Sequence, residues 1–333
     1  MRDEHDRAHA EVGDWLAGCG FHLRELVPLP GDVSPRRYAR LVARDRSTAI
    51  LATYPPEIHA VCRRFLRTTE ILATAGIAVP RVLAAACERG WMLLEDLGSQ
   101  TLADLKELPW SETSAYFDDA SALAGRIARL PAEALRELNP PLGRELLERE
   151  LAQTWEFFLE PQGLVGERSL AADLSVILDS LCAGLAAGPQ VPCHRDFMAR
   201  NLMPCRAGKV AVLDHQDLRL GPSAYDLASL LNDTLFPPAE LEERLLAGSA
   251  FVADRTCYHR AAAQRTLKAV GTYAAFARKG SCRHLPLIAP TLRRFVSHLA
   301  RLPESAALAA DLDRAWAPAL SSLPGDGRQQ AIC

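Results

Sequence analysis

Hydrophobic and polar positions repeat differently in the first hundred residues and in the rest of the chain. Alternation with a period of about two predicts short strands over residues 21–27, 37–43, 48–53, 79–83 and 90–95. Helical spacing predicts a short helix over residues 8–20 and a longer one over residues 57–75, which ends at Gly76. This order of elements predicts a small α+β lobe built on a mixed sheet.

Beyond residue 97 the pattern becomes almost wholly helical. Residues 111–187 have helical periodicity, which is interrupted only around prolines. The apolar run 210–214 predicts one strand, and helical spacing then returns in the 240s and over residues 255–279 and 291–302. We therefore expect an N-terminal lobe over residues 1–96 and a large helical C-terminal lobe over residues 97–333.

Composition and charge narrow the class of protein. The 333 residues are 49% hydrophobic and 24% charged, and the formal net charge is −3, so no overall field favours nucleic acid or an anionic membrane as a partner. The charged N-terminus lacks the pattern of a signal peptide, and no apolar run approaches a membrane span. Nine cysteines without a C-x-x-C pair predict reduced thiols rather than a disulfide framework or zinc module. We expect a cytoplasmic protein, with a monomer as the default.

The motif that carries chemistry is H-R-D-x-x-x-x-N at residues 194–201, followed by an apolar run that ends in Asp214. Phosphoryl transfer needs one carboxylate to accept the proton of the attacking hydroxyl, and a second carboxylate with an amide oxygen to hold magnesium against the phosphates. Asp196 suits the first task, and Asn201 and Asp214 suit the second. The motif predicts ATP and Mg²⁺ as cofactors.

Two further residues near this motif are expected to act structurally. His194 should pack and hydrogen-bond within its own loop, as such histidines usually do. Asp226 should accept backbone N–H bonds and thereby fix the loop that carries Asp196.

These motifs resemble the aminoglycoside phosphotransferase and choline kinase branch of the kinase-like superfamily. Asp214 continues as His-Gln-Asp rather than Phe-Gly, and the block Gly221–Leu230 is similar to the G-[DP]-x-x-Y-D-L-A block of that branch. Within the branch the chain resembles the anomeric N-acetylmuramate and N-acetylglucosamine kinases of bacterial cell-wall recycling. The segments that carry this resemblance are 31–38, 93–98, 194–201, 213–217 and 264–271. It implies a bilobal protein-kinase-like fold with the active site between the lobes.

Two charged residues that kinase-like folds usually have are missing. The third strand, residues 48–54, contains no lysine for the nucleotide phosphates, and the position of its glutamate partner falls near Phe65. The joint absence of the lysine and the glutamate makes physical sense, because either charge without the other would be unpaired in the cleft. Arg36, Arg37 and Arg63 are the candidates to supply the missing positive charge.

The resemblance also implies where the nucleotide binds. The backbone C=O of Glu95 and the N–H of Leu97 would hold adenine, although the segment could be a plain linker. Gly31 and Ser34 would belong to a loop that covers the phosphates, with Arg36 and Arg37 beside it. A simple hairpin is the alternative for this second segment.

The acceptor pocket is expected in the helical lobe. Glu150 and Trp155 lie on one helix and offer a polar group and an aromatic face, which sugars require, although most of that helix reads as ordinary core. Asp217 could contact the acceptor or a second magnesium, or could cap a helix. Arg200, in the motif itself, is also assigned to the acceptor.

A late helix adds Gln264, Arg265 and Lys268 on one face. They could contact a carboxyl or acetamido group of the acceptor, or they could simply be solvated. Arg265 is the one that we assign to substrate binding.

Together these features predict an ATP-dependent kinase for the anomeric hydroxyl of N-acetylmuramate, N-acetylglucosamine or both, with a sugar 1-phosphate as product. Two alternatives stay open. One is a phosphotransferase for another hydroxyl acceptor, such as an aminoglycoside, a choline-like alcohol or a different hexose. The other is a pseudokinase that acts as a nucleotide sensor or scaffold.

Overall fold

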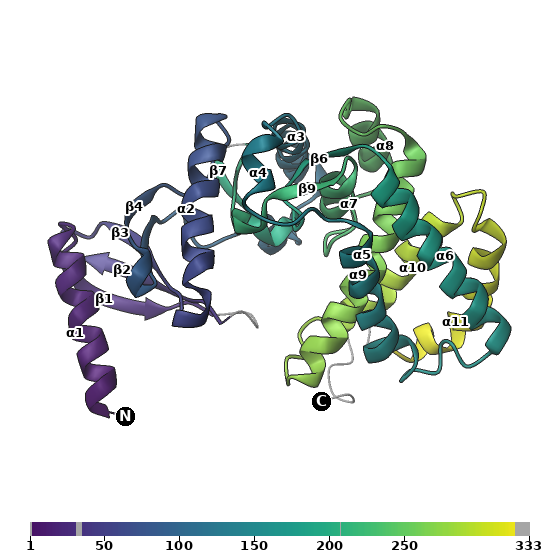
Figure 1. The fold of residues 1–333 in the computed structure, drawn as a ribbon, viewed down its shortest axis with the longest axis horizontal. Coiled ribbons are helices and arrows are strands. Elements are labelled where there is room, and N and C mark those ends of the chain that lie inside the picture. Colours follow the sequence, from purple (N-terminus) through teal and green to yellow (C-terminus); the bar gives the residue numbers. More distant parts are fainter. Residues whose placement is uncertain (1, 31–34, 207, 324–333) are drawn as a thin grey trace. The chain divides into compact units, whose positions relative to one another are not determined.

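The chain divides into two compact units (Figure 1). This computed structural model describes residues 2–30, 35–206 and 208–323, so the predicted phosphate-loop residues Gly31 and Ser34 lie outside the described part. The smaller unit comprises Met1–Ser99 together with Ala211–Gln216, and the larger unit comprises the remainder.

The smaller unit is built on a five-stranded sheet with the order β1-β2-β3-β5-β4. Its strands are β1 (Leu23–Pro28), β2 (Arg37–Ala43), β3 (Thr48–Thr53), β4 (Val82–Ala86) and β5 (Trp91–Glu95). Strands β2 and β3 have the bounds that the alternation predicts, whereas β4 begins three residues later than expected. Every pairing in the sheet is antiparallel, so the prediction of a mixed sheet was wrong.

A helix covers each face of this sheet (Figure 1). Because side chains alternate along a strand, Leu51 of β3 packs with Leu16 of α1 (Arg2–Gly18), whereas its neighbour Ala52 packs with Phe65 of α2 (His59–Thr74). Helix α2 is followed by Gly76, whose φ of 68° is the left-handed conformation expected after a helix.

The segment Ala211–Gln216 packs on α2 and so belongs to the smaller unit. The N–H of Val212 donates to the carbonyl of Ala78 at 2.8 Å. The ring of His215 lies 4.3 Å from that of Phe65, and its Nδ1 lies 2.8 Å from Thr68 Oγ1. Phe65, at the position of the missing glutamate, therefore helps to hold the segment that carries Asp214.

The larger unit is mainly helical, as the pattern predicts. Its helices are α3 (Trp110–Ile127), α4 (Glu133–Arg136), α5 (Arg144–Thr154), α6 (Arg168–Ala187), α7 (Tyr225–Leu231), α8 (Ala239–Gly248), α9 (Arg255–Arg278), α10 (Ile288–Leu299) and α11 (Ala306–Ser322). Short helical turns in the larger unit are η3 (Leu102–Leu105), η5 (Ala199–Asn201), η7 (Leu285–Leu287) and the π-helical η4 (Trp155–Leu159). The turns η1 (Pro56–Ile58) and η2 (Cys87–Arg89) belong to the smaller unit, and η6 (His215–Asp217) begins there.

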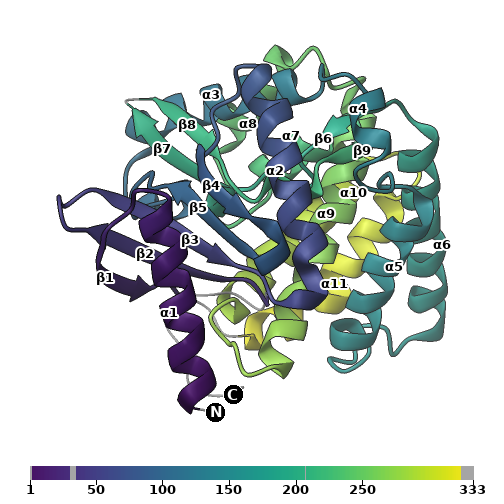
Figure 2. The same ribbon diagram turned by 60° about the vertical axis from the view of Figure 1, so that its left-hand side comes forward.

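Helix α9 lies at the centre of this unit, packed against α5, α6, α7 and α10 (Figure 2). It approaches α5 closely because Gly271 has no side chain: a β-carbon there would lie 2.3 Å from Thr154 Oγ1. The same hydroxyl donates to the carbonyl of Leu267 at 3.0 Å. This close packing fixes the register between the polar residues of α5 and those of α9.

Two short two-stranded ribbons flank the motif loop, and the last two residues of β8 belong to the smaller unit. Strand β6 (Gln190–Cys193) pairs with β9 (Arg219–Pro222), and β7 (Leu202–Arg206) pairs with β8 (Lys209–Val212). The sequence pattern did not indicate β6, β7 or β9. The motif loop, residues 194–201, connects β6 to β7 and is therefore tied at both ends.

Two expectations from composition need correction. Among the described residues, α6 alone is long and apolar enough to cross a membrane, which is weak evidence for a membrane span. Only 28% of its apolar window is buried, and α6 packs against α5, α9 and α11. Cys282 is disulfide-bonded, against the expectation of reduced thiols. Free thiols are found at Cys19, Cys62, Cys87, Cys182, Cys193, Cys205 and Cys257.

Candidate active site

The loop that begins at His194 is held by the buried carboxylate of Asp226. This residue lies in the first turn of α7 and accepts the backbone N–H groups of His194 at 2.7 Å and Arg195 at 2.9 Å. Burial raises the pKa of Asp226 to about 6, although both bonds favour the ionised form. The predicted role of Asp226 is confirmed.

These two bonds stabilise a strained backbone. Arg195 has a φ of 78°, a left-handed conformation that costs a residue with a side chain about 1–2 kcal/mol. His194 is fully buried, with its ring edge-on to that of Phe197 at 5.8 Å, so its predicted packing role is confirmed. The left-handed residue thus stands directly before Asp196.

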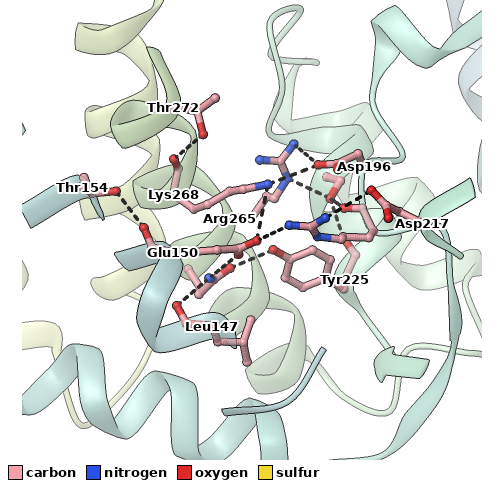
Figure 3. Close-up of polar contacts among 12 residues, drawn as sticks. Leu147, Glu150, Thr154, Asp196, Asp217, Tyr225, Arg265, Lys268 and Thr272 are labelled. Atoms are coloured by element: carbon pink, nitrogen blue, oxygen red, sulfur yellow. Dashed lines mark hydrogen bonds and ion pairs between the residues drawn. The ribbon is translucent and has the colours of Figure 1, made fainter. Parts of the chain in front are cut away.

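The carboxylate of Asp196 is surrounded by positive charge (Figure 3). Its Oδ1 lies 3.2 Å from Lys268 Nζ and 3.5 Å from Arg265 Nη2, both on α9. Burial by itself would raise the pKa of Asp196, but the charges of Lys268, Arg195 and Arg265 outweigh it and hold the pKa well below its usual value. Asp196 is therefore ionised at neutral pH and can accept a hydrogen bond from a hydroxyl.

A second carboxylate lies behind this cluster. Glu150 of α5 is 8% exposed and accepts Arg195 Nη2 at 2.8 Å, with Lys268 Nζ at 3.9 Å. Burial alone would raise the pKa of Glu150, yet the two cations lower it overall. Arg195 Nη1 also donates to Asp217 at 3.4 Å, so its guanidinium links Glu150 to Asp217.

The polar face of α9 is buried rather than solvated. Gln264 accepts a hydrogen bond from the hydroxyl of Tyr225 at 3.0 Å and donates one to Glu150 at 3.3 Å. Arg265 Nε donates to Ser229 Oγ at 3.1 Å. The structure therefore excludes the solvated alternative for these residues.

Asn201 and Asp214 carry the oxygens predicted to hold magnesium. Asn201 Nδ2 donates to the backbone carbonyl of Asp196 at 2.9 Å, which leaves its amide oxygen as a ligand candidate. Asp214 belongs to the smaller unit, has a φ of 55°, and accepts Gln216 Nε2 at 3.1 Å. Carboxylate and amide oxygens are hard ligands that suit Mg²⁺, which usually binds through one or two carboxylates and substrate phosphates. Within the described ranges no group of three or more His, Cys, Asp or Glu residues forms a protein-only cage.

Of the three arginines considered as substitutes for the missing lysine, Arg36 lies beside Asp214. Its Nη1 is 2.7 Å from Asp214 Oδ1, and its side chain is 12% exposed. Arg37, the first residue of β2, is exposed, and Arg63 pairs at the surface with Glu88. Arg36 lies just before β2, whereas Arg37 is its first residue, and only the former of the two is paired with Asp214.

The segment after β5 is ordered by arginines. Glu95 accepts Arg81 Nε at 3.1 Å, and Asp96 accepts two bonds from Arg40 at 2.7 and 3.0 Å. Leu97 is half-buried. Because these side chains bind within the protein, only the backbone groups of Glu95 and Leu97 suit the predicted contact with adenine.

Two predicted acceptor residues are not part of the cluster around Asp196. Trp155 lies five residues from Glu150, about 140° around the helix, and lines a groove of about 430 Å³ with residues of α6. Arg200 of η5 lies near His284; burial, and then the Arg200 charge, lower the pKa of His284 to about 4. The sequence did not single out Arg195, whose only signal was its place in the motif, and it indicated Lys268 as one of three candidates on a shared helix face without assigning it a role.

Comparison with known proteins identifies the family. The model of the phosphotransferase enzyme family matches residues 25–263. The chain belongs to this family. It is similar to the N-acetylmuramate/N-acetylglucosamine kinase of Pseudomonas aeruginosa, with 33% identity over 91% of this chain and 95% of the relative. The protein of the same name from Neisseria meningitidis is 30% identical over 84% of this chain and 85% of the relative.

Solved structures of this branch have the same fold. The choline kinase of Streptococcus pneumoniae gives a TM-score of 0.61 at 13% identity, over 89% of this chain and 99% of that one. The macrolide 2′-phosphotransferase of Brachybacterium faecium gives 0.62 at 19% identity, over 85% and 97%. The predicted family and α+β fold class of this phosphotransferase are confirmed.

Proposed function

We propose that this phosphotransferase is an ATP-dependent kinase that phosphorylates the anomeric hydroxyl of N-acetylmuramate, N-acetylglucosamine or both. The observation that carries the proposal is the carboxylate of Asp196, which three cations keep ionised at the start of the motif loop. Relatives named N-acetylmuramate/N-acetylglucosamine kinase, 30–33% identical over most of the chain, support the choice of acceptor.

In the proposed reaction Asp196 accepts the hydrogen bond, and then the proton, of the acceptor hydroxyl. The acceptor oxygen bonds to the γ-phosphorus in line, and the bond to the bridging oxygen breaks, so that ADP leaves with the electron pair. Catalysis is mainly positioning and charge neutralisation. An anomeric hydroxyl is more acidic than an ordinary alcohol, which suits a carboxylate as weakly basic as Asp196.

The nucleotide and metal would be held by residues that the sequence already indicated. The amide oxygen of Asn201 and the carboxylate of Asp214 would bind Mg²⁺, which neutralises phosphate charge. Residues 1–96 would form the nucleotide-binding lobe, with adenine on the backbone of Glu95 and Leu97. Residues 97–333 would form the catalytic and acceptor-binding lobe.

The acceptor would contact the cluster around Asp196. Glu150, Asp217 and Arg265 are the candidates that the larger unit gathers there through Arg195 and Lys268. Arg200, on the same loop as Asp196, stays a candidate for an anionic group of the acceptor. The groove location of Trp155 gives it no part in this proposal.

The test is a panel of acceptors incubated with ATP and Mg²⁺, with the new phosphate located by phosphorus NMR. We expect N-acetylmuramate and N-acetylglucosamine to be phosphorylated, with the phosphate coupled to the proton at C1. Choline, an aminoglycoside and glucose are included as competing acceptors. A phosphate at any other position, or a clear preference for one of these competitors, would contradict the proposal, and absence of all transfer would favour the pseudokinase alternative.

A further inference from the structure

Lys268 lies beside the carboxylate of Asp196, although it is 72 residues further along the chain. The motif loop itself supplies apolar side chains after Asp196: Phe197 and Met198 are 0% and 1% exposed. The ammonium that contacts Asp196 therefore comes from α9, whereas the motif loop contributes the guanidinium of Arg195. The packing of Gly271 on Thr154 fixes the helix that carries Lys268.

The three cations near Asp196 are not equivalent. The guanidinium of Arg195 is occupied by Glu150 and Asp217, and that of Arg265 is 6% exposed and donates to Ser229. Lys268 is 13% exposed, and within the described part of the chain its ammonium has one contact of hydrogen-bond length, to Asp196. An ammonium has three donors, so two remain for a ligand at Asp196.

The proposed transfer brings a negatively charged phosphoryl group to the oxygen that Asp196 holds. Two anions would then lie close together in a partly buried site, where their repulsion is strong. A cation between them offsets this repulsion, and it does so most when charge develops during transfer. Lys268 already bridges two carboxylates, Asp196 at 3.2 Å and Glu150 at 3.9 Å, and so is held in place for this task.

We propose that Lys268 is a catalytic residue: its ammonium donates to an oxygen of the phosphoryl group as that group bonds to the acceptor oxygen held by Asp196. This role rests on the proposed transfer reaction. The proton of the hydroxyl still goes to Asp196, ADP leaves with the electrons of the broken bond, and Lys268 keeps its protons throughout.

The decisive variant is Lys268→Gln, which keeps a hydrogen-bond donor for Asp196 but removes the charge. We expect kcat to fall by about 10²–10³-fold, as for other transition-state donors, with the KM values of ATP and acceptor within about threefold. Lys268→Arg, which keeps the charge, should stay within about tenfold of the parent kcat. Lys279→Gln, at the exposed end of the same helix, is the matched control and should not differ from the parent.

Three other outcomes would contradict a result expected here, and they distinguish failure of the role of Lys268 from failure of the proposed function. A kcat of Lys268→Gln within threefold of the parent, with Asp196→Asn inactive, removes Lys268 and leaves the transfer reaction in place. A raised KM for N-acetylmuramate alone assigns the ammonium to the carboxylate of the acceptor instead. An active Asp196→Asn variant contradicts the proposed function itself.

A measurement on the unmodified protein guards against a variant that does not fold. Reductive methylation of lysines, followed by mass spectrometry, should modify Lys268 in the presence of ADP, Mg²⁺ and sugar. Adding aluminium fluoride, which mimics the phosphoryl group in transfer, should protect it at least tenfold, with Lys279 as the internal reference. Equal modification under both conditions would exclude the proposed contact.

Discussion

Asp196 and Asp214, the two aspartates of the motif set, have different surroundings. Asp196 belongs to the larger unit and has the charges of Lys268, Arg265 and Arg195 around it. Asp214 belongs to the smaller unit, and its carboxylate pairs with Arg36 and accepts a bond from the amide of Gln216. Their side chains are similarly exposed, at 26% and 34%, so burial does not explain the contrast.

The contrast matches two different tasks. A carboxylate among cations fixed by helix packing stays ionised and oriented, which suits a group that accepts one hydrogen bond and one proton. A carboxylate paired mainly with one arginine can exchange that partner for a divalent ion. The surroundings, rather than the residue type, therefore distinguish the proposed base from the proposed metal ligand.

The strongest test of this contrast is to neutralise each aspartate in turn. Asp196→Asn should lower kcat by about 10³–10⁴-fold and leave ATP affinity within a few-fold, because the carboxylate acts on the acceptor. Asp214→Asn should lower kcat comparably but also abolish the magnesium dependence of ATP binding. Steady-state kinetics and calorimetric ATP titrations with and without Mg²⁺ distinguish the two; identical binding defects would show that the contrast has no functional meaning.

Asp226 holds the loop that carries Asp196, and we expect it to make the free energy of unfolding depend on pH. Its pKa is about 6 in the folded protein and about 3.9 when unfolded, so the folded state binds the proton more tightly. The contribution of Asp226 to the free energy of unfolding is therefore fully present below about pH 4. As the pH rises through about 6, up to about 3 kcal/mol of this contribution is lost. Denaturant unfolding at pH 4 and pH 7 should show the parent losing this advantage over Asp226→Asn, in which the group does not titrate. A pH-independent difference would mean that Asp226 has an ordinary pKa.

The two adjacent arginines Arg36 and Arg37 test whether the ion pair with Asp214 matters for ATP binding. Arg36→Gln should raise the KM of ATP by about tenfold, because one charge-assisted bond near the phosphates is lost. Arg37→Gln, at the adjacent and exposed first residue of β2, is the matched control and should change KM less than twofold. Equal effects of the two substitutions would show that overall charge, rather than the pair with Asp214, matters.

The sequence predicted the parts of the fold and site that depend on local pattern. Alternation gave the bounds of β2 and β3, and the motif indicated Asp196, Asn201 and Asp214 without any structure. Trp155 and Glu150 were both assigned to the acceptor pocket; the helical period separates them on their helix, and the acceptor role of Trp155 stays a prediction. Strands β6, β7 and β9 were missed because they are only four or five residues long and have no clear period.

The sequence alone determined that this chain is a kinase-like phosphotransferase, since its motifs are short and their residues are neighbours along the chain. Only the tertiary structure decided which charges surround those residues. Lys268 lies 72 residues from Asp196, and Glu150 lies 45 residues from Arg195. Contacts at such separations depend on how α5 and α9 pack. Gly271 permits that packing, but the sequence does not show that this glycine meets Thr154. Arg36 and Arg37 have the same charge and are adjacent, yet Arg36, just before β2, pairs with Asp214, whereas Arg37 is exposed.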